Sequence, residues 1–401
     1  MRTLIKNAKL YDAFHHYELC DILVDDDRIE AIEPNITCED AKKIDLTGYT
    51  VMPGFTDAHV HIATFPPDPK GVKVEHEYVP DTLLGFAANG VTLVKELGMC
   101  VQAPLEPYLE WLAGHNQADK ARIVTAGRYI DVKGGYGMGP AFDGPPDWGI
   151  QIKTPEEAAD AVTYQYQAGV QGIKIGISDG GMGPKAGELS HDMIRAIVRR
   201  AHSHGIWTSA HVYKAEDLWK LCECGIDEAA HTPHDRLSDE LIGLMVYKGM
   251  RMTTTLGTEH KSPDEVRLPP NAAVDRQKAF EHALEQRALT VENLVRFHRA
   301  GGKISIGTDY MLRGNAMETA MINTPDLRGL FQGGMSMDDI ITCATLNGAQ
   351  ACGVWDEGAL KVHFRANLLA FSGRLSETFR ELEHLPFVMN RGVVITDKRA
   401  L

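Results

Sequence analysis

The chain has 401 residues, and its contents of 44% hydrophobic and 24% charged residues are those of a globular protein, which excludes disordered, collagenous and coiled-coil classes. With 55 acidic against 41 basic residues, the formal charge of -14 argues against nucleic acid and anionic membrane surfaces as partners. The seven cysteines form no C-x-x-C pair, the first residues do not resemble a signal peptide, and no apolar run of about 18 residues occurs. We therefore expect reduced thiols and a soluble, cytoplasmic protein.

Short β-strands are predicted at both ends of the chain, separated by acidic turns and by the turn sequence Asn390-Arg391-Gly392. The predicted strands cover residues 4–8, 21–24, 29–32, 367–371 and 388–395. We expect the two ends to pair, so that residues 1–53 and 356–401 form one small β-sandwich domain.

Between these ends, short apolar strands alternate with helices, which predicts a parallel sheet with crossover helices. Capping sequences that begin at Thr154, Ser238 and Ser336 mark helix starts. The predicted strands end near His61, Gly98, Arg128, Ile177, His211, His231, Leu256 and Asp309. Such units are most simply closed as an α/β fold of the (β/α)8 TIM-like barrel type, here over residues 54–355.

Histidines and an aspartate stand at several of these strand ends. His59 and His61 close the first strand of the barrel, and the alternation of a β-strand turns both imidazoles to the same side. An H-x-H pair alone does not separate a metal site from ordinary histidines. His211, His231 and Asp309, however, end three other strands, and the carboxyl ends of barrel strands converge at one rim.

Lys174 lies inside the apolar strand 172–176, where a charged ammonium is costly to bury. Two interpretations remain open: an ion pair with a carboxylate at the strand ends, or a carbamate formed from carbon dioxide and the neutral amine. A carbamate offers two anionic oxygens that can bridge two metal ions, whereas an ammonium has no free lone pair.

The order of these residues and the sequences around them resemble the amidohydrolase superfamily, in its binuclear metal-dependent branch with a carboxylated lysine. The matching segments are residues 53–61 (Pro-Gly-Phe-Thr-Asp-Ala-His-Val-His), 90–98, 173–175, 225–231 and 307–309, together with His211. Residues 90–98 and 210–213 are most similar to the prolidase-like (Xaa-Pro dipeptidase) and imidazolonepropionase-related members. The chain departs from the peptidase-like pattern at Tyr136, where those members carry histidine, so the resemblance leaves the substrate open.

The resemblance implies a site for two divalent metal ions. It assigns His59, His61 and Asp309 to one ion, His211 and His231 to the other, and a carbamate on Lys174 to the bridge between them. Zn2+ is the expected ion because imidazole and oxygen ligands suit it, although manganese, iron and cobalt fit the same ligands.

We expect a hydrolase that cleaves an amide (C–N) bond, with a hydroxide bridging the two ions as the nucleophile and Asp309 as the general acid and base. A dipeptide, an N-acyl amino acid or a cyclic amide would each suit this chemistry. Two alternatives remain open. One is a mononuclear-type deaminase of a purine-like or other amino-heterocycle, against which Lys174 argues, and the other is a non-catalytic metal-binding barrel.

Four further residues are candidates for binding a small-molecule substrate. Arg128 and Arg313 are predicted to hold a substrate carboxylate by forked contacts, with a surface ion pair as the alternative for each. Tyr136 and Tyr213 are predicted to donate to a developing oxyanion, or simply to line the rim. His234 shows no spacing signal and is interpreted as a solvated or lid residue. The resemblance also suggests a homo-oligomer.

Overall fold

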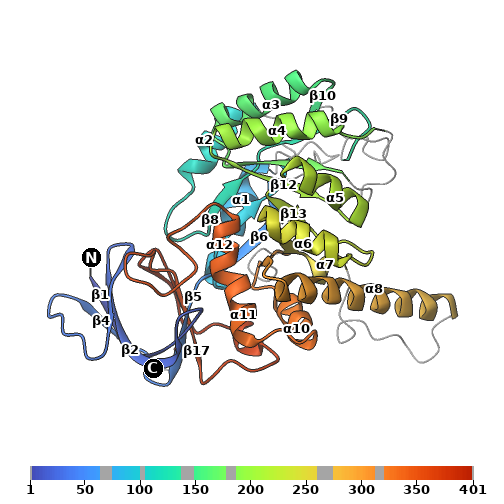
Figure 1. The fold of residues 1–401 in the computed structure, drawn as a ribbon. Helices are drawn as coiled ribbons and strands as arrows, with labels where there is room; N and C mark the ends of the chain where they lie inside the picture. The colour runs from blue at the N-terminus through green and yellow to red at the C-terminus, as the bar shows by residue number, and fades with distance from the viewer. Residues whose placement is uncertain are drawn as a thin grey trace.

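The computed structural model describes residues 2–63, 75–99, 104–136, 149–177, 187–259, 274–311 and 320–399. Strands at the start of the chain lead into alternating strands and helices, and further strands follow near its end (Figure 1). The strands form one sheet of eight strands, one of seven and one of four. The predicted α/β class is therefore confirmed. No helix in these ranges is both long and apolar enough to cross a membrane.

The eight-stranded sheet combines strands from both ends of the chain, and both termini lie on its side of the molecule (Figure 1). Its strands are β1 (Thr3–Tyr11), β2 (His16–Asp25), β3 (Arg28–Glu33), β4 (Lys42–Asp45), β5 (Tyr49–Pro53), β17 (Leu368–Ser372), β18 (Phe387–Asn390) and β19 (Val393–Asp397). The order is β19-β18-β17-β5-β1-β2-β3, and β4 pairs with β1. The two ends join where β5 pairs antiparallel with β17, over a core that includes Ile22, Val51 and Phe387.

The middle of the chain forms two parallel sheets with the orders β10-β9-β11-β12-β13-β14-β15 and β16-β6-β7-β8. Their strands are β6 (Phe55–His61), β7 (Val91–Glu96), β8 (Arg122–Thr125), β9 (Tyr129–Val132), β10 (Gly149–Ile152), β11 (Gly172–Gly176), β12 (Trp207–His211), β13 (Glu228–Ala230), β14 (Arg251–Thr254), β15 (Lys303–Ile306) and β16 (Tyr310–Met311). The strand predicted to end near Arg128 is in fact two strands, β8 and β9, because the chain turns at Gly127, whose φ is 66°. Strands β9, β10 and β16 are too short to show an alternating pattern in the sequence.

Backbone hydrogen bonds connect the two parallel sheets at two places. At one, the N–H of Asp309, three residues after β15, donates to the carbonyl of His59 on β6 over 2.8 Å. At the other, the N–H of Gln171, just before β11, donates to the carbonyl of Thr125 on β8 over 3.0 Å. The first of these bonds brings the carboxyl end of β6 next to the segment that follows β15.

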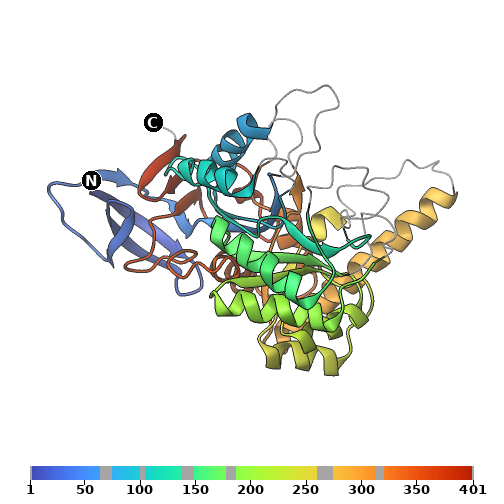
Figure 2. The same cartoon turned by 90° about the horizontal axis from the view of Figure 1, so that it is seen from above.

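Helices follow most of the parallel strands and pack against them from outside (Figures 1 and 2). They are α1 (Glu75–Ala88), α2 (Leu105–Gly114), α3 (Pro155–Ala168), α4 (His191–Ser203), α5 (Ala215–Cys224), α6 (Asp239–Lys248), α7 (Leu256–Glu259), α8 (Val274–Arg299), α10 (Thr324–Gln332), α11 (Met337–Thr342) and α12 (Gly348–Ala351), with a π-helical turn at Cys343–Asn347 and a 3-10 turn at Arg380–Leu382. The helix starts predicted at Thr154, Ser238 and Ser336 are confirmed, because each side chain accepts a hydrogen bond from the backbone N–H three residues later.

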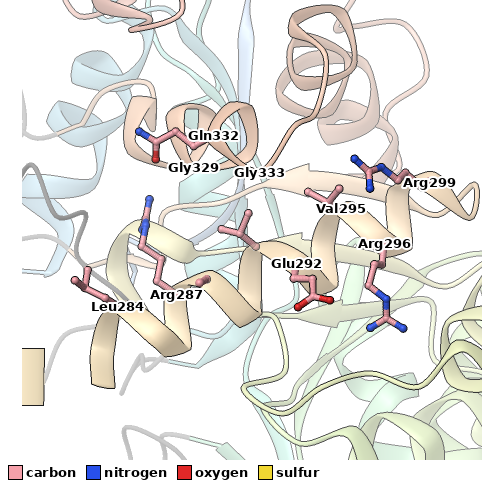
Figure 3. A pocket seen from close by; sticks show the side chains of 11 residues that line it. Leu284, Arg287, Glu292, Val295, Arg296, Arg299, Gly329, Gln332 and Gly333 are labelled. Carbon is pink, nitrogen blue, oxygen red and sulfur yellow. The ribbon is translucent and has the colours of Figure 1, made fainter. Parts of the chain in front are cut away.

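A surface cavity of about 500 Å³ lies between α8 and α10 (Figure 3). Apolar side chains such as Leu284, Val291 and Val295 line it, with Arg287 near one end and Arg299 near the other. Its walls come from α8, α10 and Gly333, and the residues that line it include none of the predicted site residues. The six described cysteines are all free thiols.

Candidate metal centre

The predicted H-x-H pair lies at the end of β6 and is buried. The Nε2 atoms of His59 and His61 are 3.2 Å apart, so the two rings point to one spot. Asp309 lies on the same spot, with Oδ1 at 3.3 Å from His59 Nε2 and 3.2 Å from His61 Nε2. All three ligand atoms lie within 4.8 Å of one another. Two imidazole nitrogens and a carboxylate oxygen at these separations form a group that suits a divalent cation.

The backbone around Asp309 holds its carboxylate in place. Asp309 has a φ of 52°, a left-handed conformation that costs free energy in a residue other than glycine. Its N–H is tied to the His59 carbonyl, as described above, and the preceding Thr308 donates to the buried Asp57 through its N–H (3.0 Å) and its hydroxyl. Asp57 also accepts from the N–H of His59 at 3.2 Å. One buried carboxylate therefore fixes both ligand-bearing segments.

A second pair of histidines stands beside the first. His211 ends β12 and His231 directly follows β13, with ring centroids 4.6 Å apart, and His231 also lies 4.6 Å from the ring of His59. His231 has a φ of 80°, and its Nδ1 is 2.7 Å from Thr255 Oγ1. Both ring nitrogens of His211 are buried without a hydrogen-bond partner in the described ranges. Because buried polar atoms normally have partners, an ion would suit one of these two nitrogens.

Lys174 is 1% exposed on β11, and its Cα pairs in register with that of Ser209 on β12. Burial lowers the pKa of the Lys174 amine to about 7, although the negative charges of Asp309 and Glu228 oppose this change. No carboxylate in the described part of the chain forms a direct salt bridge with Lys174, although the charges of Asp309 and Glu228 act on its amine, so the two interpretations remain predictions. A partly neutral, buried amine is the form that carbamate chemistry requires.

The charges in the site favour different protonation states on neighbouring groups. Burial, together with the positive charge of Lys174, lowers the pKa of His59 well below its usual value. Burial also opposes a proton on His61, but the neighbouring carboxylates of Asp309 and Glu96 raise its pKa to about 9. Burial tends to raise the pKa of Asp309, yet the hydrogen bond with His61 keeps it below the usual range. Asp309 is therefore ionised at neutral pH.

Aromatic side chains line the site on the side of the second histidine pair. Tyr136 stacks on His211, with ring centroids 3.9 Å apart and an interplanar angle of 21°. Tyr213 meets His211 edge-on at 4.6 Å and lies 4.8 Å from His231. The structure thus places both predicted tyrosines next to predicted ligands. His234, interpreted as a solvated or lid residue, is half-buried, its ring stacks on Tyr213 with centroids 4.3 Å apart, and its backbone N–H donates to the Tyr213 carbonyl. Its interpretation stays a prediction.

Of the two predicted arginines, the structure describes only Arg128. Arg128 is half-buried between β8 and β9, where its backbone N–H and carbonyl both bond to the side chain of Gln165. Its role toward a substrate carboxylate stays a prediction. Arg313 lies outside the described residues.

The sequence of residues 50–396 matches the amidohydrolase family. This chain belongs to the amidohydrolase family. The match covers most of the chain and contains every predicted ligand, and it confirms the resemblance seen in the motifs. It also confirms the assignment of the chain to a family of enzymes that act on carbon–nitrogen bonds.

Similar proteins include both sequence relatives and solved structures. A dihydroorotase of Thermoanaerobacter sp. (strain X514) is 45% identical over 62 residues, so the match covers 16% of this chain and only 14% of the length of that protein. A solved prolidase complexed with N-methylphosphonate-L-proline is 22% identical, with a TM-score of 0.80 over 99% of this chain and 100% of its own. A solved Xaa-Pro dipeptidase with methionine bound in its active site is 22% identical, with a TM-score of 0.78 over 98% and 99%. The predicted likeness to prolidase-like members is confirmed at the level of the fold, and the likeness to imidazolonepropionase-related members stays a prediction.

Several residues around the centre of this amidohydrolase were not among the predicted site residues. Tyr129 on β9 places its hydroxyl 3.4 Å from Nδ1 of His61, and Glu96 at the end of β7 places Oε1 3.6 Å from the same nitrogen. Thr255 holds His231, and Asp57 holds the segments of His59 and Asp309. Asp57 and Glu96 both lie within segments that carry the family resemblance, and a charged side chain in an apolar strand was the available signal.

Proposed function

We propose that this amidohydrolase uses two divalent metal ions, with Zn2+ as the expected ion, to hydrolyse an amide bond in a small molecule. The observation that carries the proposal is the convergence of the H-x-H pair, a second histidine pair and a carboxylate from separate strand ends. His59, His61 and Asp309 would hold one ion, and His211 and His231 the other. Ions bound at such a site lower the pKa of a water molecule and polarise a carbonyl group.

Asp309 is the group that would carry the proton. It is ionised at neutral pH, and its side chain is 25% exposed, whereas the side chain of His59 is completely buried. A charged carboxylate that is accessible beside the ligands can accept a proton from water and deliver it to the leaving nitrogen. The hydrogen bonds of the flanking backbone keep this carboxylate aimed at the same spot as the two imidazoles.

Lys174 would supply the bridge between the ions as a carbamate. Carbon dioxide reacts with the neutral amine: the nitrogen lone pair forms the new N–C bond, and one N–H proton is released to water. The lowered pKa of Lys174 supports this step, because about half of an amine with a pKa of about 7 is neutral at pH 7. The product carries two anionic oxygens where the ammonium had none.

The proposed substrate is a dipeptide, an N-acyl amino acid or a cyclic amide. The solved prolidase and Xaa-Pro dipeptidase share the fold, and the dihydroorotase shares a short stretch of sequence, so both linear and cyclic C–N substrates have support. Tyr136 and Tyr213 would face the substrate from the aromatic side of the site. Arg128 and Arg313 would hold its carboxylate. A cytoplasmic homo-oligomer completes the proposal.

We also propose that the two parallel sheets close into one (β/α)8 TIM-like barrel over residues 54–355. The hydrogen bonds from Asp309 to His59 and from Gln171 to Thr125 support this, because they connect the two sheets at two separate places. Residues 1–53 and 356–401 would then form the second domain, a small β-sandwich, and their shared eight-stranded sheet supports that boundary.

The test combines metal analysis with a substrate screen. We expect about two divalent ions per chain after purification in zinc-containing buffer, and turnover of at least one dipeptide, N-acyl amino acid or cyclic amide that a chelator abolishes and zinc restores. One ion per chain together with deamination of an aminopurine would favour the deaminase alternative. Metal binding without turnover of any of these classes would favour the non-catalytic barrel.

A further inference from the structure

Glu96 is a completely buried carboxylate at the end of β7, next to the segment that leaves the H-x-H pair. Its Oε2 accepts hydrogen bonds from the backbone N–H of Ile62 at 2.6 Å and of Ala63 at 3.0 Å. These are the two residues that directly follow His61. The carboxylate therefore ties β7 to the carboxyl end of β6 and fixes the direction in which the chain leaves the site.

The other oxygen of Glu96 faces the ring of His61. Oε1 lies 3.6 Å from Nδ1 and is buried with no hydrogen-bond partner in the described ranges. The opposite ring nitrogen, Nε2, points to Asp309 and to Nε2 of His59, so it is the nitrogen that would bind an ion. A histidine that binds a metal through one nitrogen usually donates its other N–H to a carboxylate or carbonyl, which fixes the tautomer and raises the basicity of the ligand.

We propose that Glu96 is a positioning residue that holds His61 for metal binding through two contacts at once. One oxygen fixes the backbone immediately after the ligand, and the other accepts the Nδ1–H of the ring, a contact that shortens when Nε2 is bound to an ion. The inference rests on the proposed metal-dependent function. The proposed set of metal ligands assigns no role to Glu96, so the inference adds a residue to the site.

Two other groups near Nδ1 set the size of the effect. The carbonyl of Gly98 is at 3.3 Å and the hydroxyl of Tyr129 at 3.4 Å. Both are uncharged, whereas an ionised acceptor forms a hydrogen bond roughly twice as strong. Removing the charge of Glu96 should therefore weaken metal binding without abolishing it, because Gly98 can still accept the ring N–H.

The experiment must separate this role from a purely structural one. Glu96→Gln keeps a carbonyl oxygen for the N–H groups of Ile62 and Ala63, but it removes the charge and turns an NH2 group toward the ring. Glu96→Asp keeps the charge but withdraws it by one methylene. Glu357→Gln is the matched control: Glu357 is also a buried carboxylate, bound to Arg122 at 2.9 Å and to Asn367 at 3.0 Å, and it precedes β17 in the chain.

The readouts are the affinity of the metal-stripped chain for Zn2+, measured by competition with a chromophoric chelator, and the visible spectrum of the Co2+-loaded chain. We expect Glu96→Gln to bind roughly 10- to 100-fold more weakly than the wild type and to shift the Co2+ bands, because the ligand field of His61 changes. Glu96→Asp should fall between the two, and Glu357→Gln should match the wild type in both measurements.

Wild-type affinity and an unchanged Co2+ spectrum in Glu96→Gln would overturn the inference. If that variant does not fold, Glu96→Asp decides, since an aspartate with wild-type affinity and spectrum has the same consequence. Equal losses in Glu96→Gln and Glu357→Gln would also overturn it, because they would indicate general destabilisation. A wild-type chain that binds no ion would instead refute the proposed function itself.

Discussion

Two groups of polar side chains, equally buried, differ in whether the protein itself satisfies them. At the strand ends, Nδ1 of His59 and both ring nitrogens of His211 have no hydrogen-bond partner in the described ranges. One layer deeper, at the start of β13, Glu228 forms an ion pair with Lys95 of β7 and accepts a hydrogen bond from Thr253. The polar side chains of this deeper group are therefore partners of one another.

The deeper group has all the features of a structural network. The Lys95 ammonium also lies over the ring of Trp207, 3.9 Å from its centroid, and Thr253 shares a hydrogen bond with Ser305 at 2.7 Å. Burial is therefore a poor guide to function in this molecule. Trp207 Nε1 and Ser209 Oγ are also buried without a hydrogen-bond partner in the described ranges, so an unpartnered atom alone does not mark a site either. What distinguishes the histidines is that unpartnered ring nitrogens occur where several possible ligands converge, which suits the ion binding proposed above.

The largest effect is expected from Asp309→Asn, which directly tests the group of possible ligands at the strand ends. Asparagine keeps the size of the side chain but cannot carry the proton, so turnover of an amide substrate should fall by about 10²- to 10⁴-fold. The measurement is kcat at a known zinc content, so that loss of metal is not mistaken for loss of the proton carrier. The exposed Asp239→Asn is the control and should keep full activity. Full activity in Asp309→Asn would show that Asp309 is not the proton carrier.

Lys95→Met tests the deeper group, in which Lys95 pairs with Glu228. Removing one partner of a buried ion pair leaves Glu228 charged and unpaired, which should lower the free energy of unfolding by about 3–5 kcal/mol. Adding Glu228→Gln should recover a large part of the loss, because the second change removes the unpaired charge. Urea unfolding followed by tryptophan fluorescence measures both variants. A loss in Lys95→Met no larger than that of a surface ion pair, about 1 kcal/mol, would contradict the comparison.

Lys174 lies between the two groups, and the pH dependence of metal uptake sharpens its assignment. Because its pKa is lowered to about 7, the amine is mostly an ammonium below that pH and mostly neutral above it. At a fixed concentration of dissolved carbon dioxide, the rate at which carbon dioxide promotes zinc uptake by the metal-stripped chain should therefore rise about tenfold between about pH 6 and about pH 8. Lys174→Arg, which cannot form the carbamate, is the control. Uptake that is independent of carbon dioxide at both pH values would favour a plain ammonium.

The smallest effect is expected at a hydrogen bond far from both groups. Ser238 caps α6 by accepting a hydrogen bond from the N–H of Leu241 at 3.1 Å. Ser238→Ala should lower the free energy of unfolding by about 1 kcal/mol and leave metal affinity unchanged. Thermal unfolding with and without a chelator checks both statements. An altered zinc affinity in this variant would show that general stability influences the metal readout.

The sequence predicts the ligand-bearing strand ends well because they are local patterns. The predicted end at His61 coincides with the end of β6, the end at His211 coincides with that of β12, and His231 directly follows β13. At each of these ends a histidine follows small or apolar residues, as in Ala58-His59-Val60-His61, Ala210-His211 and Ala230-His231, which is a feature of neighbouring residues alone. The pairing of the two chain ends is likewise suggested by their shared style of short strands and turns.

The supporting residues depend on contacts that no local pattern contains. Lys95 and Glu228 are far apart in the sequence, so their pairing appears only when β7 and β13 are placed in space. In the sequence, Glu96 is one of two charged residues at the end of a mostly apolar strand, and the different contacts of its two oxygens appear only when β6 is placed beside it. Tyr129 could not be predicted for a different reason: β9 has four residues, which are too few to show the alternating pattern of a strand.

The pairing of β5 with β17 has a consequence for how the chain is made. Residues Val51 and Met52 pair with Ala370 and Leu369, so the ribosome must synthesise all of the parallel strands before these early residues obtain their last neighbour. An apolar strand edge without its neighbour is prone to join other chains. A nascent chain that stalls before Leu368 would therefore be a substrate for chaperones, even when its histidine-bearing strands are already complete.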